Sequence, residues 1–476
     1  MADEPIELLT DRGTVLLRGG PSGFEFGRLP GVRYDERTGC HRAQGRQYRA
    51  IVEQLIREKI PYTDNARGWP KENAGWKRLT DRQPFPHQRE AVEAWTKAGR
   101  RGCVILPTGT GKTFVAVLAI ESTQRPTLVV TPTIDLMNQW YAELTDHFGI
   151  PIGLLGGGYY DFQAITVTSY DSAYIHLERW GHRFAMLVFD EAHHLPGATY
   201  SEAAVGSLAP FRLGLTATPE RSDGGDMMLP ELIGPIVYRK EIQQLSGQYL
   251  ADYRTQRVYI DLTDDERQRY QICKDEYRAF ASRIGISFGS PNGWQRFIFE
   301  AGRTAEGQSA LKAYRELKRI ERGASAKFTI LERLLHEHAR ERIIIFTADN
   351  ATVYEIARRY LIPPITHQTK IKERKDILKK FHSGDYGIVI TSQVLNEGVD
   401  VPAAGVGIVL SGSGSTRENV QRLGRLLRKF KGKQAILYEL IARGTGEEFT
   451  SDRRRQHGAF EKSSDGCGTG RPTRLS

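Results

Sequence analysis

Short apolar runs that alternate with helical patterns constrain the fold of this 476-residue chain more than any other feature. The alternation begins after Phe85, and this order is the signature of β-α-β units with a parallel sheet. The sequence therefore predicts an α/β protein with two parallel-sheet units. The predicted strands are Gly102–Leu106, Thr127–Thr131, Ile165–Thr168, Met186–Asp190 and Phe211–Thr216 in the first unit, and Arg342–Thr347, Pro364–Thr366, Gly387–Thr391, Val406–Leu410 and Ala435–Leu440 in the second.

Three further segments depart from this alternation. Between Asp252 and Gly323 an arginine-rich and aromatic-rich sequence predicts a helical insertion, and beyond Gly444 the scarcity of hydrophobic residues predicts disorder. Residues 1–80 mix short strand-like pieces with one helix, and their last part, from Asp64 to Thr80, is polar and is predicted to be a linker. The helix is expected over Gln47–Lys59, with Tyr48, Ile51, Val52, Leu55 and Ile56 on its apolar face.

Composition excludes several classes of protein. The longest apolar runs, such as Phe184–Phe189, are far shorter than the 18 or so residues of a spanning helix, so no membrane association is expected. The acidic start lacks an apolar signal core, and four scattered cysteines provide neither a disulfide framework nor a recognisable zinc site. The net charge is +10, and residues 415–476 carry 14 basic against 7 acidic side chains. A polyanionic partner and a merely solvated basic tail account for this charge about equally well.

A glycine-rich turn between a predicted strand and a predicted helix, Cys103–Phe114, is the first candidate site. Backbone N–H groups at such a turn surround phosphate oxygens, Lys112 reaches the β- and γ-phosphates, and Thr113 holds Mg²⁺. Leu106 stands where the strict pattern has glycine, and an ordinary strand–turn–helix junction is the alternative. The candidate phosphate-binding residues are Thr108, Gly109, Thr110, Gly111, Lys112 and Thr113.

Two carboxylates follow a second buried strand about 80 residues later. Ligands of open α/β sheets bind at the carboxyl ends of the strands, so Asp190 and Glu191 are expected beside the phosphate turn. Asp190 is predicted to complete the Mg²⁺ shell through water, and Glu191 to polarise the attacking water. His193 and His194 follow directly, and coupling or packing is favoured over metal binding because no third ligand is visible.

These residues belong to a set of motifs that resembles the superfamily 2 helicases. Within that superfamily the chain most resembles the XPB family in its compact prokaryotic form, through DSAYIHLERWGHRF, FDEAHHLP and SLAPFRLGLTATPER. The motifs are PTGTGKT (107–113), TPTIDLMNQW (131–140), TSYDSAY (168–174), DEAH (190–193), TAT (216–218), IIIFT (343–347), THQT (366–369), TSQVLNEGVDVP (391–402) and QRLGRLLR (421–428), with FPHQ ahead of them.

The resemblance implies two RecA-like lobes with ATP between them, a thumb-like helical insertion and a small α+β N-terminal domain. It also assigns roles to residues whose local sequence patterns do not indicate a role. Arginine fingers complete such a site only when the lobes close, which alternates open and closed states. The implied boundaries are 1–80 for a domain like the family's damage-recognition domain, 81–250 for lobe 1, 251–323 for the insertion, 324–445 for lobe 2 and 446–476 for a basic tail. The implied roles are adenine reading for Gln88, cleft lining for Gly398 and Asp400, arginine fingers for Arg425 and Arg428, and coupling to DNA for His193, Thr216, Thr218 and Gln421.

Two regions differ from the family pattern or extend it. Where the family has an Arg-Glu-Asp loop at the DNA fork, this chain has Arg221, Ser222 and Asp223, and a plain polar turn is an equally good interpretation. In the insertion, an aromatic face is expected to be core rather than a base-stacking platform, whereas the arginines are candidates for phosphate contacts. These arginines are Arg267, Arg269 and Arg278.

The predicted function is that of an ATP- and Mg²⁺-dependent DNA helicase or translocase with 3′–5′ polarity. The resemblance implies DNA repair such as nucleotide excision repair, DNA as substrate and a companion nuclease. It implies a cytoplasmic, nucleoid-associated location in a prokaryote and a nuclear one in a eukaryote. The alternatives are the motor subunit of a restriction-type system, an RNA helicase, and a binding platform without turnover.

Overall fold

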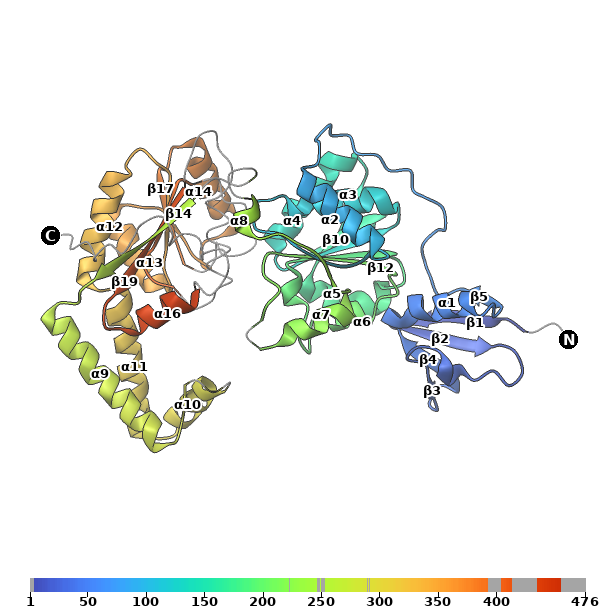
Figure 1. Cartoon of the computed structure of the whole chain (residues 1–476), viewed down its shortest axis with the longest axis horizontal. Coiled ribbons are helices and arrows are strands. Elements are labelled where there is room, and N and C mark those ends of the chain that lie inside the picture. Colours follow the sequence, from blue (N-terminus) through green and yellow to red (C-terminus); the bar gives the residue numbers. More distant parts are fainter. Residues whose placement is uncertain are drawn as a thin grey trace. The chain divides into compact units, whose positions relative to one another are not determined.

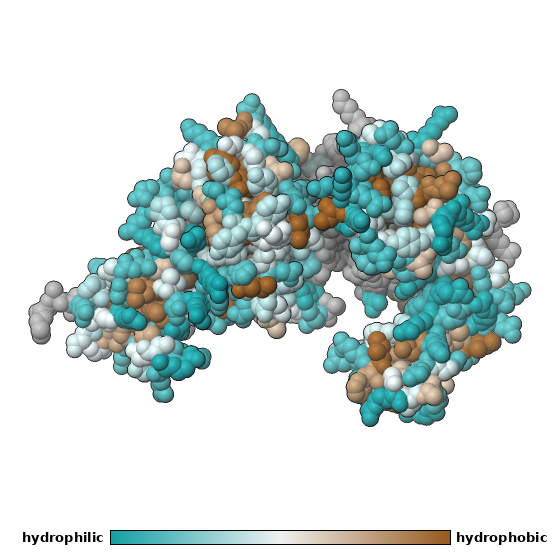
Figure 2. Space-filling view, turned by 180° about the vertical axis from the view of Figure 1, so that it is seen from behind, coloured by the Kyte–Doolittle hydropathy of each residue, from teal (hydrophilic) through white to brown (hydrophobic). Residues whose placement is uncertain are grey.

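The chain divides into two compact units, residues 1–244 and 245–476 (Figure 1). The computed structural model describes residues 4–221, 223–245, 249, 253–288, 290, 292–392, 404–412 and 435–454. Each unit contains an α/β sheet of mainly parallel strands, as the alternation of apolar runs predicts. Hydrophilic residues cover most of the face seen in Figure 2. No helix among the described residues is long and apolar enough to cross a membrane.

The N-terminal domain is a five-stranded sheet packed with one helix. Its strand order is β3-β4-β2-β1-β5, in which β1 pairs antiparallel with β2 and parallel with β5. The helix buries Tyr48, Ile51 and Leu55, whereas Ile56 is 59% exposed, so its place on the predicted apolar face was wrong. Ile56 lies four residues after Val52, which is only partly buried, so these two residues lie at the margin of the buried face. The elements are β1 (Ile6–Asp11), β2 (Thr14–Gly19), β3 (Arg33–Asp35), β4 (Cys40–Gln44), α1 (Tyr48–Arg57) and β5 (Tyr62–Asp64).

This domain shares its hydrophobic core with the following lobe. Ala185 and Leu208 of the lobe belong to the same buried cluster as the apolar residues of β1 and α1. Arg49 donates hydrogen bonds to the carbonyl oxygens of Gly99 at 2.6 Å and Pro210 at 3.1 Å. The N-terminal domain is thus fixed on lobe 1 by both apolar packing and hydrogen bonds.

The segment predicted to be a linker is held along lobe 1. In this strap, defined as residues 65–80, the Leu79 N–H donates to the His147 carbonyl at 2.7 Å. Arg78 forms an ion pair with Glu121 at 2.6 Å, and the Thr80 hydroxyl lies 2.7 Å from His147 Nδ1. The strap has no regular secondary structure and connects β5 to α2, as a linker does, and its contacts fix it on lobe 1.

Lobe 1 is an eight-stranded sheet with helices on both faces (Figure 1). All neighbouring strands are parallel except β8 and β9. All five strands predicted for this unit are present, and β8, β9 and β13 were not predicted. In sheet order the strands are β13 (Ile236–Arg239), β6 (Arg101–Ile105), β12 (Phe211–Thr216), β11 (Met186–Asp190), β7 (Thr127–Thr131), β10 (Ile165–Ser169), β8 (Ile152–Gly156) and β9 (Tyr159–Asp161). The helices are α2 (Pro86–Lys97), α3 (Lys112–Thr123), α4 (Ile134–Phe148), α5 (Tyr170–Trp180), α6 (Glu202–Val205), α7 (Leu229–Leu232) and α8 (Ile242–Leu245).

The second unit is built on a six-stranded parallel sheet in the order β14-β19-β18-β15-β17-β16. The five predicted strands are present. The prediction of helix from Asp252 was wrong at its start, because β14 pairs in parallel with β19, from Tyr253 opposite Ala435 to Ile260 opposite Ala442. The partner strand comes late in the chain, so local sequence gives no sign of it. The strands are β14 (Tyr253–Ile260), β15 (Ile343–Phe346), β16 (Pro364–Ile365), β17 (Ile388–Thr391), β18 (Val406–Val409) and β19 (Ala435–Ala442), and the helices on this sheet include α12 (Ser325–Glu337), α13 (Asn350–Tyr360) and α14 (Ile371–Ser383).

The helical insertion follows β14 and comprises α9 (Asp264–Arg283), α10 (Gly293–Ala301) and α11 (Ala305–Arg322). A capping box of Thr263 and Glu266 starts α9, which lies beside α11 (Figure 1). Tyr270 and Phe280 are buried in two small apolar clusters. The expectation that this aromatic face is core is therefore confirmed.

A last helix, α16 (Gly446–Arg454), lies in the segment predicted to be disordered. Its Glu447 accepts from the buried Lys327 ammonium at 2.7 and 2.9 Å, and Ser451 donates to Glu439 at 2.9 Å. The prediction of disorder was wrong for residues 446–454, because buried polar pairs rather than apolar residues hold this helix. Residues 455–476 lie outside the described part of the chain.

Candidate nucleotide-binding and DNA-coupling site

The phosphate turn between β6 and α3 has the geometry that its glycines predict. Gly109 and Gly111 have φ of 86° and 81°, a left-handed conformation that glycine adopts without strain. A Cβ on Gly111 would also lie 2.4 Å from the Gln88 amide nitrogen. Gly111 caps α3, so the first N–H groups of this helix lie at the turn. The arrangement provides an anion site at a helix N-terminus.

Side chains at this turn carry groups that suit a phosphate. The Lys112 ammonium donates to the Leu106 carbonyl at 3.2 Å. The Thr108 hydroxyl is shielded from solvent and forms no hydrogen bond, whereas the Thr110 hydroxyl donates to the Pro107 carbonyl at 2.7 Å. Thr113 is the second residue of α3. A triphosphate with a divalent cation fits these groups, because it would bring acceptors to Lys112 and Thr108.

Gln88 supports the turn from α2. Its amide nitrogen donates to the Thr110 carbonyl at 2.9 Å, and its amide oxygen accepts from the Phe85 N–H at 3.0 Å. His87 Nε2 lies 3.0 Å from the same Thr110 carbonyl, and burial lowers the pKa of His87. The family resemblance indicated only Gln88. The contact made by His87 was not predicted, because a single histidine that belongs to no spaced set of residues does not indicate a site.

Asp190 ends β11 and lies 7% exposed. One carboxylate oxygen accepts from Trp140 Nε1 at 2.7 Å and the other from the Glu191 N–H at 3.0 Å. Burial raises the pKa of Asp190, the Glu191 charge adds to the rise, and the Trp140 hydrogen bond opposes it. The buried Tyr170 hydroxyl donates to the Asp190 carbonyl at 3.1 Å. Trp140 and Tyr170 lie inside quoted motifs, but only the fold shows that they hold this aspartate.

Glu191 adopts a backbone conformation that is rare for a residue with a side chain. Its φ is 45°, and such strain is found where the surrounding structure fixes a functional group. Its Oε2 atom is shielded from solvent, has no hydrogen bond and lies 3.5 Å from His193 Nδ1. The residue therefore presents a carboxylate with spare acceptor capacity beside Asp190.

A chain of contacts leads from Glu191 to the end of the neighbouring strand β12. His193 is fully buried, and its Nδ1 atom lies 2.9 Å from the Thr216 hydroxyl. That hydroxyl lies 3.2 Å from both the carbonyl and the N–H of Thr218. The three described residues predicted to couple the cleft to DNA, His193, Thr216 and Thr218, are thus in direct contact.

Arg221 continues this chain. It donates to the His193 carbonyl at 2.7 Å and forms a bidentate ion pair with Asp223 at 2.8 and 2.5 Å. The guanidinium holds the pKa of Asp223 well below its usual range. Arg221 thus touches the catalytic turn, a contact that a fork-facing wedge does not require. Ser222 lies outside the described residues.

The remaining predicted site residues divide into two groups. The arginines of α9 are exposed, and Arg269 is paired with Glu316 at 2.5 Å and Asp265 at 3.6 Å. Arg267 makes a 3.4 Å contact with the Leu262 carbonyl. Gly398, Asp400, Gln421, Arg425 and Arg428 lie outside the described residues.

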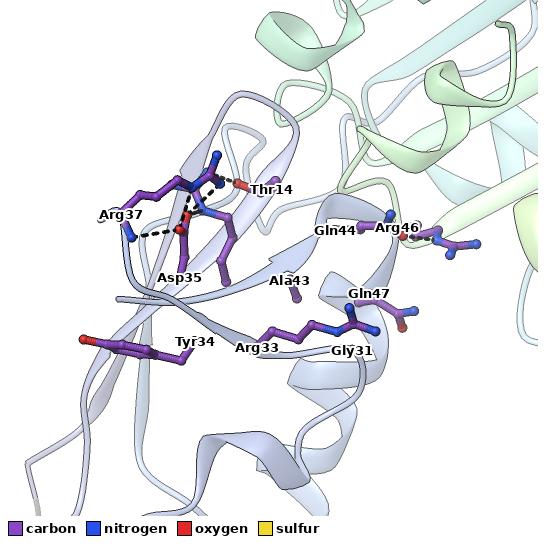
Figure 3. A pocket seen from close by; sticks show the side chains of 11 residues that line it. Thr14, Gly31, Arg33, Tyr34, Asp35, Arg37, Ala43, Gln44, Arg46 and Gln47 are labelled. Atoms are coloured by element: carbon purple, nitrogen blue, oxygen red, sulfur yellow. Dashed lines mark hydrogen bonds and ion pairs between the residues drawn. The ribbon is translucent and has the colours of Figure 1, made fainter. Parts of the chain in front are cut away.

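A separate pocket of about 590 Å³ lies on the N-terminal domain, with arginines around it (Figure 3). Arg37 and Arg42 pair with Asp35 at 2.9 and 3.3 Å, and Arg46 pairs with Glu231 at 2.5 Å. These two carboxylates offset two of the four arginine charges that line the pocket, and the pocket by itself gives no sign of damage recognition.

Three family models match the chain. The xeroderma pigmentosum group B helicase damage recognition domain matches residues 8–66. The type III restriction enzyme res subunit matches residues 81–221, and the helicase conserved C-terminal domain matches residues 326–430. The three models follow the order of N-terminal domain, lobe 1 and lobe 2.

Individual proteins extend this likeness. A DNA 3′-5′ translocase XPB2 of Sulfurisphaera tokodaii is 38% identical over 90% of this chain and 96% of its own length. A DNA 3′-5′ helicase XPB of Mycobacterium tuberculosis is 28% identical over 82% of this chain and 68% of its own length. The crystal structure of the Hef helicase domain from Pyrococcus furiosus, 20% identical, covers 78% of this chain and 98% of its own with a TM-score of 0.51.

The structural match bears on the fold, and it confirms an α/β helicase fold with two RecA-like lobes. The family is established by sequence, since the first of these relatives is well above 30% identity and is covered almost completely. The chain belongs to the XPB family of superfamily 2 DNA helicases.

Proposed function

We propose that the chain uses the lobe 1 site to hydrolyse ATP and to drive movement along DNA. As an XPB-family member it is an ATP-dependent DNA helicase or translocase. The observation that carries the proposal is the continuous contact from Glu191 through His193 and Thr216 to Thr218, which joins a catalytic carboxylate to the end of the next strand.

Each residue of the turn has a chemical role in this proposal. Lys112 and the N–H groups at the start of α3 bind the β- and γ-phosphates, and the Thr108 hydroxyl gains an acceptor there. Thr113 and Asp190 are proposed to hold Mg²⁺, which supplies positive charge when bound. Trp140 orients Asp190 for this task. Glu191 orients and polarises the attacking water through its free carboxylate oxygen.

Gln88 is proposed, from the family motif, to read the adenine; in this structure its amide group is bonded to Thr110 and Phe85. Three further roles, carried by five residues, rest on family motifs alone. Gly398 and Asp400 are proposed to contact the nucleotide, Gln421 to couple its hydrolysis to DNA, and Arg425 and Arg428 to stabilise charge on the γ-phosphate.

The setting is proposed from the relatives. Their names give 3′–5′ polarity and action on DNA, and the match to a damage recognition domain supports a role in DNA repair such as nucleotide excision repair. A companion nuclease and a location with the DNA, in the cytoplasm of a prokaryote or the nucleus of a eukaryote, are further parts of this proposal. A restriction-type motor is less well supported, since that family model covers residues 81–221 alone.

The test is ATP turnover with double-stranded DNA, forked DNA, single-stranded DNA and RNA, alongside strand separation on a fork with a 3′ tail. We expect stimulation by DNA and little by RNA. Stimulation by RNA alone would favour an RNA helicase, and the absence of turnover with every nucleic acid would favour a binding platform.

A further inference from the structure

A pocket of about 610 Å³ lies beside the catalytic turn of lobe 1. It is formed by α5, by the segment after the Asp190–Glu191 turn and by Arg221. Its volume lies within the range of about 300 to 1,000 Å³ that is usual for pockets that bind small molecules. Of its lining residues, Arg221 belongs to the predicted fork loop, whereas Tyr174, Ile175 and Tyr200 have no role in the function proposed above.

The wall of the pocket combines rings, apolar surface and charge. Tyr174 and Ile175 on α5 are 43% and 58% exposed, although both are large and apolar. Across from them the Tyr200 hydroxyl donates to the Asp171 carboxylate at 2.7 Å. Aromatic faces stack on any nucleobase, a carboxylate accepts from amino groups on base edges, and the Arg221 guanidinium suits a phosphate.

Two walls of this pocket are connected to backbone carbonyls of the catalytic turn, one directly through Arg221 and the other through Tyr170, which lies behind Tyr200. The Tyr200 ring packs on the Tyr170 ring at 5.4 Å, and the Tyr170 hydroxyl donates to the Asp190 carbonyl at 3.1 Å. On the other side Arg221 donates to the His193 carbonyl at 2.7 Å. These carbonyls flank Glu191, whose strained backbone depends on its surroundings.

We propose that this pocket binds an unpaired nucleotide of the DNA, with the base on Tyr174 and the phosphate on Arg221, and that its occupancy sets the position of Glu191. The proposal rests on the proposed function, because DNA is taken as the substrate. A phosphate competes with Asp223 for the guanidinium, and the same guanidinium holds the His193 carbonyl. Binding of DNA thereby changes how the catalytic turn is held, with Arg221 and Tyr170 as positioning residues.

The binding half of the proposal is tested with the full chain and a single-stranded oligothymidine. The DNA concentration that gives half-maximal ATP turnover should rise roughly tenfold in Tyr174→Ala, because a stacking surface is lost, and stay near wild type in Tyr174→Phe. Tyr159→Ala, which removes a tyrosine that is 54% exposed outside the pocket, is the matched control. An oligonucleotide with 5-iododeoxyuridine should photocross-link to the peptide that contains Tyr174.

The coupling half is tested by variants that keep the shape of the pocket. Tyr170→Phe removes only the hydroxyl that donates to the Asp190 carbonyl. Arg221→Lys keeps the positive charge but removes the planar guanidinium that donates to two partners at once. Both should lower turnover at saturating DNA, by roughly tenfold for Arg221→Lys, while the KM for ATP changes much less. The half-maximal DNA concentration should stay near wild type in Tyr170→Phe and should rise in Arg221→Lys, because Arg221 also holds the phosphate. Loss of fold is recognised as a fall in Tm together with a raised KM.

The outcomes separate the two levels of inference. If wild type shows no stimulation by DNA, the proposed function fails. If wild type is stimulated, but Tyr174→Ala behaves like Tyr159→Ala and no cross-link maps to the pocket, the nucleotide site is overturned and a protein partner becomes the better occupant. If Tyr170→Phe and Arg221→Lys keep full DNA-saturated turnover, the coupling is overturned.

Discussion

The catalytic edge of lobe 1 and the helical insertion use the same residue types to different ends. At the catalytic edge, Asp190 and His193 are buried, and both Asp190 carboxylate oxygens and His193 Nδ1 have defined partners. In the insertion, the side chains of Arg269 on α9 and its partner Glu316 on α11 are 46% and 32% exposed. Buried polar networks fix the positions of their side chains, because a buried polar group that loses its hydrogen bond costs free energy. Exposed ion pairs rearrange readily, because water replaces either partner.

The difference indicates that lobe 1 carries out ATP hydrolysis and that the insertion contributes to DNA affinity. A site that orients water for hydrolysis needs groups that cannot move, and lobe 1 supplies them. A surface that meets a moving polyanion needs charges that exchange partners, and the insertion supplies those. We therefore expect substitutions at the catalytic edge to change turnover and substitutions on α9 to change the salt dependence of binding.

The largest expected effect is that of Glu191→Gln, which keeps the shape but removes the charge that polarises water. Hydrolysis should fall by roughly 10² or more, whereas ATP still binds. The measurements are ATP turnover and equilibrium binding of ATP. Glu178→Gln, an exposed glutamate on α5, is the matched control and should hydrolyse like wild type. Wild-type turnover in Glu191→Gln would show that this carboxylate is not the one that acts on water.

A moderate effect is expected for the insertion arginines. Replacing Arg267, Arg269 and Arg278 by Gln should flatten the plot of log affinity against log salt by about one unit for each true phosphate contact. Arg269 should contribute least, because its partners Glu316 and Asp265 compete with phosphate. Arg303→Gln, in the same insertion and paired with Glu300, controls for a general loss of charge. An unchanged slope in the triple variant would limit these side chains to solvating the helix.

The smallest expected effect concerns the strap, where His147 is buried against Thr80. Burial, together with Arg82 and Arg78, lowers the pKa of His147 below its ordinary value of 6.5. Below about pH 6.5 the unfolded chain takes up the proton more readily than the folded one, so stability falls as the pH drops toward the folded pKa.

The measurement is thermal unfolding at about pH 7.5 and 5.5. His147→Gln keeps a polar partner for Thr80 and should lose about a few degrees less on acidification than wild type. His382→Gln, an exposed histidine of the second unit, should follow wild type. Equal acid losses in wild type and His147→Gln would mean that His147 does not set the pH dependence of this unit.

The sequence by itself determined the two parallel-sheet units, the phosphate turn and the carboxylate pair. These features depend on local patterns: apolar runs, glycines at a strand–helix junction and charges at a strand end. The motif resemblance added the family, which the comparisons confirm. It also named Arg425 and Arg428, whose role stays a prediction.

Only the tertiary structure decided which residues hold the catalytic ones. Trp140 and Tyr170 meet Asp190 from α4 and α5, and Arg221 reaches the His193 carbonyl from beyond β12. The same holds for β14, whose partner β19 lies at the far end of the chain. Such contacts join segments distant in sequence, and they form because parallel strands bring their carboxyl ends to one edge. No local sequence pattern predicts these contacts, since neither partner belongs to a recognisable motif for the contact and only the fold brings the two together.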